Sequence, residues 1–143
     1  MRESTRIESG SREDTYELGK RIGEQAKPGM VYTLVGDLGV GKTVLTQGVA
    51  GGIGIKGIVN SPTFTILQVY EDGRLPFYHF DVYRIGGAEE LEDIGFYEYA
   101  SGDGICLCEW ADLIKEELPH RRVNVLIERL DGDKRKIMLN EAE

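Results

Sequence analysis

The amino-acid sequence predicts an α/β fold, in which helices flank a mixed β-sheet that also contains antiparallel hairpins. Helix and strand patterns alternate over residues 12–50, an order typical of parallel strands joined through helices. Two later pairs of strand patterns are each joined by a short turn-forming segment, which favours antiparallel pairing. The length of 143 residues supports one domain, residues 1–143, with a core of its own.

The alternating part begins with a helix that is predicted over residues 12–26. Ser11 starts a capping box, apolar residues recur every fourth position, and the proline at position 28 ends the pattern. A short apolar run rich in β-branched residues predicts a buried strand over 30–35. A second helix is predicted over 43–50, because glycines follow it directly.

The later part of the chain is predicted to contain more strands than helices. Residues 71–74 and 131–133 carry the Asp and Gly residues typical of tight turns, and each segment lies between two strand patterns. Pro119 ends the last helical pattern. The predicted strands cover residues 64–70, 77–83, 105–108, 123–130 and 135–139, and the predicted helices cover residues 88–93 and 111–118.

The acidic residues are unevenly distributed along the chain. The 25 acidic and 17 basic residues give a formal net charge of −8, which disfavours a broad nucleic-acid interface. Residues 86–118 contain ten acidic residues and one basic residue, so this stretch accounts for the whole excess. Two interpretations stay open: a solvated helical surface, or a surface that docks a basic partner through residues such as Glu89, Glu90 and Glu92.

Cysteine usage and hydropathy predict a cytoplasmic protein. Cys106 and Cys108 lie two apart in an apolar strand pattern, where their side chains point the same way but are poorly placed to bond each other. We therefore expect reduced thiols in the core. No apolar run reaches the length of a membrane-spanning helix, and the first ten residues are too polar for a secretory signal.

A phosphate-binding motif occupies residues 36–43. The sequence Gly-Asp-Leu-Gly-Val-Gly-Lys-Thr matches G-x-x-x-x-G-K-[ST] and lies between a predicted strand and a predicted helix. Its glycines allow a tight loop whose N–H groups converge on phosphate oxygens, and the helix adds its N-terminal dipole. Lys42 is placed to reach the β- and γ-phosphates, and Thr43 to present its hydroxyl to Mg²⁺. The motif predicts a nucleotide site in a P-loop NTPase-like sheet.

Two acidic residues are candidates for the rest of such a site. Glu109 follows an apolar strand pattern, where a second acid for the metal belongs, although Asp is the usual residue there. The alternative for Glu109 is a surface carboxylate at a strand end. Asp81 lies between His79 and Tyr83, and a period of two puts all three side chains on one face of a strand. That face belongs to a site or, alternatively, faces solvent.

The loop at residues 60–63 lies where P-loop proteins place a nucleotide-sensing switch. Ser61 and Thr63 carry hydroxyl groups that can reach a γ-phosphate or a metal-bound water. The alternative is that these residues only initiate a turn. Arg84 is a candidate arginine finger, with a surface position as its alternative.

Four motifs, in this order, resemble those of one bacterial family. They are Gly-Asp-Leu-Gly-x-Gly-Lys-Thr at 36–43, Ser-Pro-Thr-Phe at 61–64, His-x-Asp-x-Tyr-Arg at 79–84 and Glu-Trp at 109–110. Their spacing and the chain length are similar to those of the TsaE family, formerly YjeE, and the resemblance spans nearly the whole chain. It implies a P-loop ATPase needed to make threonylcarbamoyladenosine (t6A), the modified base beside the anticodon of tRNAs that read ANN codons.

The resemblance also implies cofactors and partners. The implied cofactors are ATP or ADP and Mg²⁺. The implied partners are TsaD and TsaB, within whose complex ATP hydrolysis supports multiple turnover, while TsaC supplies the activated threonylcarbamoyl-adenylate. We expect tRNA to be met indirectly, through this complex, and we expect no membrane partner.

For single residues, the resemblance implies that Lys42, Asp81 and Glu109 are catalytic. Thr43 and Glu109 are implied to bind Mg²⁺, and Asp81 to position the attacking water. The loop 61–64 is implied to act as a switch.

The resemblance further implies where the nucleotide lies. The adenine is expected between the segment around Ser11 and the C-terminal hairpin, where Lys134 or Arg135 provides a basic contact. The implied nucleotide-binding residues are Ser11, Arg12, Gly36, Gly39, Val40, Gly41, Lys42, Thr43, Val44, Ser61, Thr63, Trp110 and Lys134.

Other functions stay open on the sequence. A small-molecule kinase uses the same loop, although this chain offers little sequence for an acceptor pocket and a lid. A nucleotide-controlled binding module, in which hydrolysis is incidental, is the second alternative. A GTPase is disfavoured because the sequence contains no Asn-Lys-x-Asp guanine motif.

Overall fold

The computed structural model describes residues 4–36, 41–56, 67–83 and 85–142. Its elements are β1 (Ser4–Ser9), α1 (Arg12–Gln25), β2 (Val31–Val35), α2 (Lys42–Ile53), β3 (Leu67–Tyr70), β4 (Phe77–Asp81), α3 (Ala88–Asp93), α4 (Phe96–Ala100), β5 (Ile105–Glu109), the 3₁₀ helix η1 (Ala111–Glu117), β6 (Arg122–Arg129) and β7 (Arg135–Ala142). None of these helices is long and apolar enough to cross a membrane.

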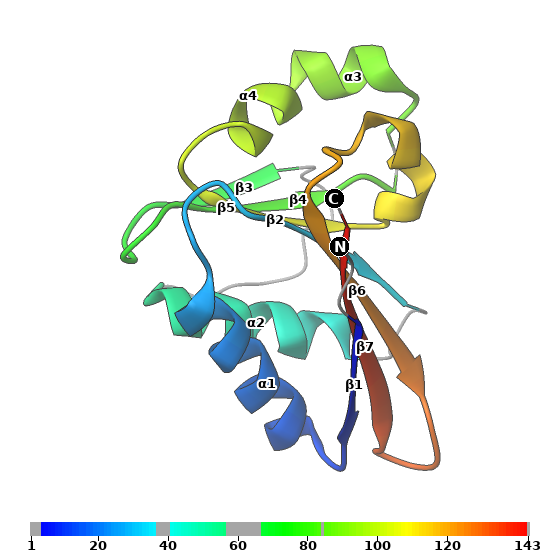
Figure 1. The fold of residues 1–143 in the computed structure, drawn as a ribbon. Helices are drawn as coiled ribbons and strands as arrows, with labels where there is room; N and C mark the ends of the chain where they lie inside the picture. The colour runs from blue at the N-terminus through cyan, green and yellow to red at the C-terminus, as the bar shows by residue number, and fades with distance from the viewer. Residues whose placement is uncertain (1–3, 37–40, 57–66, 84, 143) are drawn as a thin grey trace.

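The strands form a seven-stranded mixed sheet in the order β1-β7-β6-β2-β5-β4-β3. Its inner strands β6, β2, β5 and β4 run parallel, whereas β3, β7 and β1 each pair antiparallel with their neighbours. The sheet twists, so that β6, β7 and β1 run down the molecule in Figure 1 while β3, β4 and β5 lie across it. The predicted α/β architecture with antiparallel hairpins is confirmed.

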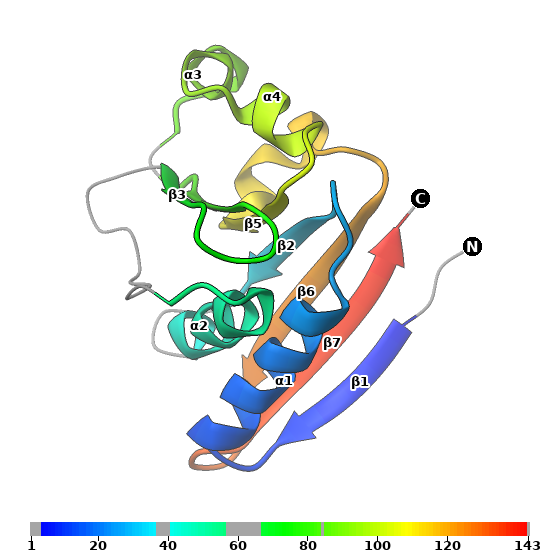
Figure 2. The same cartoon turned by 90° about the vertical axis from the view of Figure 1, so that its left-hand side faces the viewer.

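Helices cover both faces of the sheet. In Figure 1, α1 and α2 lie below the crossing strands and α3 and α4 above them, and Figure 2 shows α1 beside α2. Successive strand residues point to opposite faces of the sheet. Phe77 and Leu107 belong to the core that contains Leu45 of α2, whereas Phe80 and Cys108 belong to a second core. The central strands β2 and β5 are therefore buried on both faces, whereas β6 is buried mainly on one face.

Several predicted boundaries differ from the observed ones. The strand predicted over 77–83 ends at Asp81, whose carboxylate accepts a hydrogen bond from the Tyr83 N–H and so turns the chain. The segment predicted as a helix over 111–118 is a 3₁₀ helix that ends at Glu117. Of the strand predicted over 64–70, residues 64–66 lie outside the described residues.

Two elements have no counterpart among the predicted ones. The strand β1 is mostly polar and pairs along its whole length with β7, so cross-strand hydrogen bonding forms it in the absence of a clear apolar pattern. The short helix α4 follows Gly95, whose positive φ of 79° starts a new helix directly after α3.

The helices α1 and α2 touch through glycines. A Cβ atom on Gly23 would overlap the carbonyl oxygen of Val49, and one on Gly52 would overlap the carbonyl oxygen of Lys20. Gly19 and Gly48 make the same kind of backbone approach one turn earlier. The two helices therefore run side by side in the same direction with almost no side chain between them. This packing explains why α2 continues to Ile53, past the predicted end at residue 50.

Both cysteines are free and buried, as expected for core thiols. Burial raises the pKa of Cys106 from 9.0 to about 12, and the pKa of Cys108 is also raised, chiefly by burial. Because the native thiol binds its proton more tightly than the unfolded one, its stabilisation is complete below about pH 9. It is lost as the pH rises from about 9 towards 12.

We therefore expect the free energy of unfolding to fall between pH 8 and pH 10.5, with about 2 kcal/mol of the loss due to Cys106. Urea unfolding at both pH values measures this loss. Cys106→Ala is the control: it lowers stability at pH 8 but flattens the pH dependence. An equal alkaline loss in both proteins would contradict the assignment to this thiol.

Candidate functional site

The candidate site lies at one edge of the sheet, where the parallel strands β2, β4 and β5 end. Residues Asp81 and Glu109 are register partners at the ends of β4 and β5, and Leu34 of β2 pairs with Glu109. Gly36 follows β2 at this edge, and α2 begins with Lys42. Ligands of open α/β sheets bind at such carboxyl ends, in the crevice beside a change in strand order.

Lys42 lies against an aromatic side chain at the end of β5. Its Nζ atom is 4.0 Å from the centroid of the Trp110 ring, and only 7 % of Lys42 is exposed. Trp110 adopts a left-handed conformation with φ of 62°, which is uncommon for a residue other than glycine. Its ring also packs on Tyr83, with 4.7 Å between ring centroids. The turn after β5 thus places an indole ring over the lysine of the phosphate motif.

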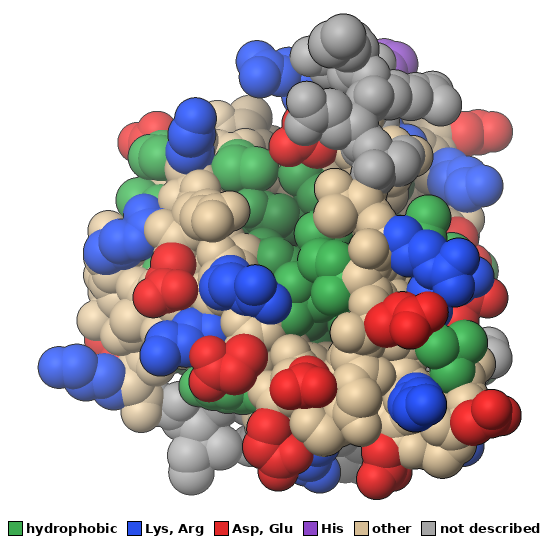
Figure 3. Space-filling view, turned by 60° about the horizontal axis from the view of Figure 1, so that its bottom comes forward, with side chains coloured by type: hydrophobic (Ala, Val, Ile, Leu, Met, Phe, Trp, Pro, Cys, Tyr) green, Lys and Arg blue, Asp and Glu red, His purple; other side chains and the backbone are tan. Residues whose placement is uncertain are grey.

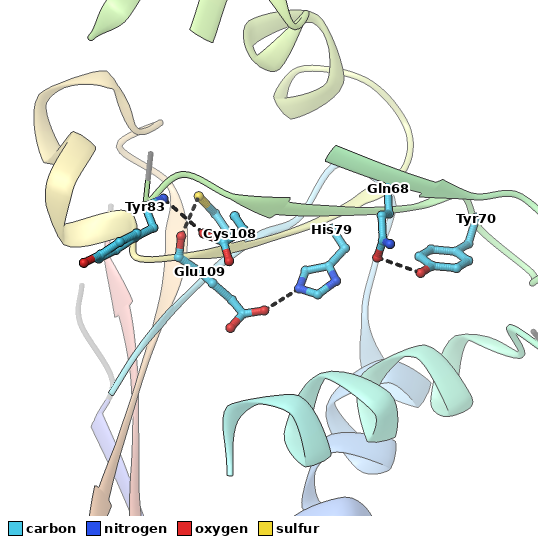
Figure 4. A network of polar contacts seen from close by, with 7 residues as sticks. Gln68, Tyr70, His79, Tyr83, Cys108 and Glu109 are labelled. Atoms are coloured by element: carbon cyan, nitrogen blue, oxygen red, sulfur yellow. Dashed lines mark hydrogen bonds and ion pairs between the residues drawn. The ribbon is translucent and has the colours of Figure 1, made fainter. Parts of the chain in front are cut away.

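Glu109 is paired with a histidine inside the protein. The carboxylate Oε2 and His79 Nε2 are 2.5 Å apart, and both side chains are buried. Figure 4 shows Glu109 reaching from the end of β5 towards His79 of β4, on the side of the sheet where α2 lies. The predicted alternative of a surface carboxylate for Glu109 is therefore wrong, and so is an outward, solvated position for His79.

Asp81 is half-buried, and both burial and nearby charged groups shift the pKa of its carboxyl group. Burial is the largest influence and raises the pKa of Asp81, whereas the hydrogen bond from the Tyr83 N–H lowers it. The Glu109 carboxylate adds a further rise in this pKa, and His79 and Lys42 lower it. These groups therefore lie close enough to interact, although the sequence separates them by up to 67 positions. Tyr83 is exposed, whereas His79 is buried. The three side chains predicted to share one face of a strand, His79, Asp81 and Tyr83, therefore do not share one environment.

A small hollow joins the beginnings of α1 and α2. It has a volume of about 220 Å³, and its lining includes Arg12 and Tyr16 of α1 and Val44 of α2. Ser11 caps α1 by accepting a hydrogen bond from the Asp14 N–H at 3.1 Å. The structure thus brings the predicted residues Arg12 and Val44 together, while the hydroxyl of Ser11 already has a structural partner.

The C-terminal hairpin reaches the same edge of the sheet. Ser9, just before α1, pairs with Arg135 at the start of β7. The guanidinium group of Arg135 donates to the carbonyl oxygens of Gly132 and Lys134 in its own turn. Lys134 is exposed. Of the two basic residues predicted for this position, Lys134 is therefore the one whose side chain extends into solvent.

Part of the predicted site lies outside the described residues. This applies to Gly39 and Val40 of the phosphate motif, to Ser61 and Thr63 of the predicted switch, and to Arg84. Gly41, the last glycine of the motif, has a φ of 112° and precedes α2 directly.

The two residues predicted to bind Mg²⁺, Thr43 and Glu109, carry side-chain oxygens of the kind that Mg²⁺ prefers. Within the described ranges no group of three His, Cys, Asp or Glu side chains forms a metal cage. Mg²⁺ usually keeps several waters and takes one or two protein oxygens together with phosphate oxygens. The carboxylate of Glu109 and the hydroxyl of Thr43 are oxygens of this kind, and no partner of the Glu109 carboxylate other than His79 is found in the described part of the chain.

A larger hollow, of about 660 Å³, lies at the opposite edge of the sheet. Met30, Tyr32 and Leu139 contribute to its lining, together with Lys27 and Arg121. Figure 3 shows a hollow with a hydrophobic floor and charged side chains around it, on the side that is lowest in Figure 1. None of the predicted site residues lines the larger hollow, so its volume is no guide to the nucleotide site.

Two features of the site have no clear signal in the sequence. The pairing of His79 with Glu109 joins residues 30 positions apart, and only the alternation that puts His79 on the Asp81 face hints at it. The left-handed Trp110 occupies a conformation for which glycine or asparagine is the expected residue. Both features follow from how strands that are distant in sequence pair.

Comparisons with known proteins agree on one family. A family model described as "Threonylcarbamoyl adenosine biosynthesis protein TsaE" matches residues 9–137. The tRNA threonylcarbamoyladenosine biosynthesis protein TsaE of Bacillus subtilis is 54% identical over 125 residues, covering 87% of this chain and 78% of that protein. The TsaE protein of Treponema pallidum is 41% identical over 132 residues, covering 92% and 97% respectively.

A solved structure shows the same fold. The crystal structure of Bacillus subtilis YdiB superposes with a TM-score of 0.86 and 43% sequence identity, covering all of this chain and 88% of that one. Family model, relatives and fold thus match over nearly the same residues, including the edge where Lys42, Asp81 and Glu109 meet. The chain therefore belongs to the TsaE family of tRNA threonylcarbamoyladenosine biosynthesis proteins.

Proposed function

We propose that this protein is a Mg²⁺-dependent ATPase that acts with TsaD and TsaB to support repeated rounds of t6A formation. The observation that carries the proposal is the convergence of Lys42, Asp81 and Glu109 at the end of the parallel strands, directly after a phosphate-binding motif. Few other protein functions need a lysine at a helix start beside two carboxylates at strand ends.

In this proposal the protein acts by positioning and by neutralising charge. Lys42 and the N–H groups at the start of α2 hold the phosphates, so the lysine leaves the face of Trp110 when it meets them. Asp81 orients the attacking water, and Glu109 and Thr43 hold Mg²⁺. When bound, Mg²⁺ neutralises the charge on the β- and γ-phosphate oxygens. The hollow beside Arg12, Tyr16 and Val44 is the proposed position of the adenine ring.

The acidic stretch 86–118 remains a candidate docking surface. Glu89, Glu90 and Glu92 are exposed on α3, so their carboxylates are accessible to a basic partner. The same exposure suits a purely solubilising surface, and both interpretations are kept in the proposal.

The proposal is tested by measuring ATP turnover of the isolated protein and of its mixture with TsaD and TsaB. We expect slow turnover alone and an increase of roughly tenfold or more in the mixture, because partner contacts that complete phosphoryl-transfer sites accelerate them strongly. The readout is inorganic phosphate, with a parallel screen for other phosphorylated products. Equal rates with and without the partners would refute partner completion, and a phosphorylated small molecule would favour a kinase.

A further inference from the structure

The pairing of His79 with Glu109 is a feature for which neither fold nor phosphate motif accounts. Only 1 % of His79 and 3 % of Glu109 is exposed, so an ionisable pair lies almost completely inside the protein. A buried carboxylate is costly unless it is hydrogen-bonded, and pairs of this kind are often no more stabilising than apolar residues of the same size. The pair therefore calls for a use beyond stability.

The hydrogen bond has a clear direction. An ionised carboxylate can only accept, so His79 Nε2 carries the proton that is shared with Glu109 Oε2. His79 Nδ1 is buried and has no hydrogen-bond partner in the described part of the chain.

The bond fixes one oxygen of Glu109 and leaves the other available. No second partner of the carboxylate is recorded among the described residues, although the side chain is 96 % buried. Glu109 is the last residue of β5 and the register partner of Asp81, so the carboxylate lies where the parallel strands end. An unpaired oxygen of a buried carboxylate at this edge is placed for a ligand that prefers hard oxygen atoms.

We propose that His79 is a positioning residue, whose Nε2–H holds Glu109 so that the second carboxylate oxygen is presented to nucleotide-bound Mg²⁺. The inference rests on the proposed function and deepens it by one residue. Hydrogen bonds to a metal-binding side chain typically change metal affinity by about 10- to 100-fold. In this role His79 does not contact the nucleotide. Its replacement therefore weakens Mg²⁺ binding to the nucleotide complex and does not change the nucleotide affinity measured without Mg²⁺.

The experiment compares His79→Gln, His79→Asn and His79→Leu with the unaltered protein. The amide nitrogen of Gln falls close to the position of Nε2 and keeps the donor, whereas Asn is polar but too short, and Leu is apolar. Binding of a fluorescent ADP analogue is titrated with Mg²⁺ and measured separately in EDTA. Thermal melting confirms that each variant is folded at the temperature of the titration.

We expect the Mg²⁺ midpoint to rise about 10- to 100-fold in the Asn and Leu variants and to stay within about threefold of the original in the Gln variant. Affinity for the analogue in EDTA stays the same in all four proteins. A purely structural role predicts instead equal losses with and without Mg²⁺, and that result would overturn the inference. Unchanged midpoints in folded Asn and Leu variants would overturn it as well.

If the Asn and Leu variants do not fold, the Gln variant provides the test. A Mg²⁺ midpoint raised more than threefold in the Gln variant would show that a hydrogen-bond donor at this position does not preserve Mg²⁺ binding, and would overturn the inference. The titration uses ADP binding alone, so it is separate from the proposed ATPase activity. If the unaltered protein shows no ATP turnover, either alone or with TsaD and TsaB, the proposed function is refuted but the role of His79 is not. If the affinity of the unaltered protein for the ADP analogue is the same with and without Mg²⁺, the role of His79 is refuted but ATP turnover is not.

Discussion

Replacing Gly52 with alanine is expected to lower the free energy of unfolding by about 3 kcal/mol, at the upper end of what overpacked cores cost. The added Cβ would overlap the carbonyl oxygen of Lys20 and come within 2.8 Å of the Glu24 backbone nitrogen. Both obstacles are backbone atoms of α1, so no side-chain rotation relieves them. For a domain of this size the loss corresponds to a decrease in Tm of roughly 10 °C, which calorimetry or circular dichroism measures.

The neighbouring Gly51 provides a matched control in the same helix. A Cβ there would meet the Tyr16 hydroxyl at 2.6 Å, and this is the free end of a side chain that can move aside. Gly51→Ala is expected to be neutral within about 1 kcal/mol, because alanine also favours the helix. Equal Tm values for the two variants would contradict the close packing of α1 against α2.

The effect of Gly52→Ala extends to the candidate site, because the two helices carry different parts of it. Arg12 is the first residue of α1, and Lys42 is the first residue of α2. A wider separation of the helices would move the Arg12 side of the small hollow away from Val44. Surviving folded protein is therefore expected to bind the nucleotide more weakly than the unaltered protein does.

The sequence was sufficient for the parts of the fold that local patterns control. The capping box at Ser11, the glycines after α2 and the turn residues at 131–133 mark element ends with known turn and cap chemistry. The alternation of helices and strands was enough to predict parallel pairing. The polar strand β1 was missed because its stability comes from pairing with β7, which no local pattern reports.

The candidate site divides in the same way. The phosphate motif is local, so Lys42 and its helix could be predicted from eight consecutive residues. By contrast, the contacts of Lys42 with Trp110 and of His79 with Glu109 depend on the order of β2, β5 and β4 in the sheet. The strand pattern indicated Glu109 and the resemblance supplied Trp110, whereas the bond between Glu109 and His79 became evident only from the structure.

Asp81→Asn is expected to lower ATP turnover by about 10²- to 10⁴-fold, the range typical of a lost group that handles the attacking water. Asparagine preserves the size of the side chain and removes the charge that orients water. The phosphates are held from α2 in the proposal, so ATP binding remains. A fall in kcat with little change in KM is the expected signature. The exposed Asp103→Asn, which makes the same change of charge away from the site, should retain the turnover of the isolated protein.

The same variant separates an ATPase from a nucleotide-controlled binding module. Repeated tRNA modification is measured with TsaC, TsaD, TsaB and tRNA in excess, once with the unaltered protein and once with Asp81→Asn. If hydrolysis resets the complex, the variant supports a first round of modification and then stalls. The reason is that the variant binds ATP but does not hydrolyse it, so the ATP-bound complex persists. If the variant sustains many rounds without hydrolysing ATP, nucleotide binding alone is the working signal and hydrolysis is incidental. Normal ATP turnover by the variant would instead remove Asp81 from the catalytic residues.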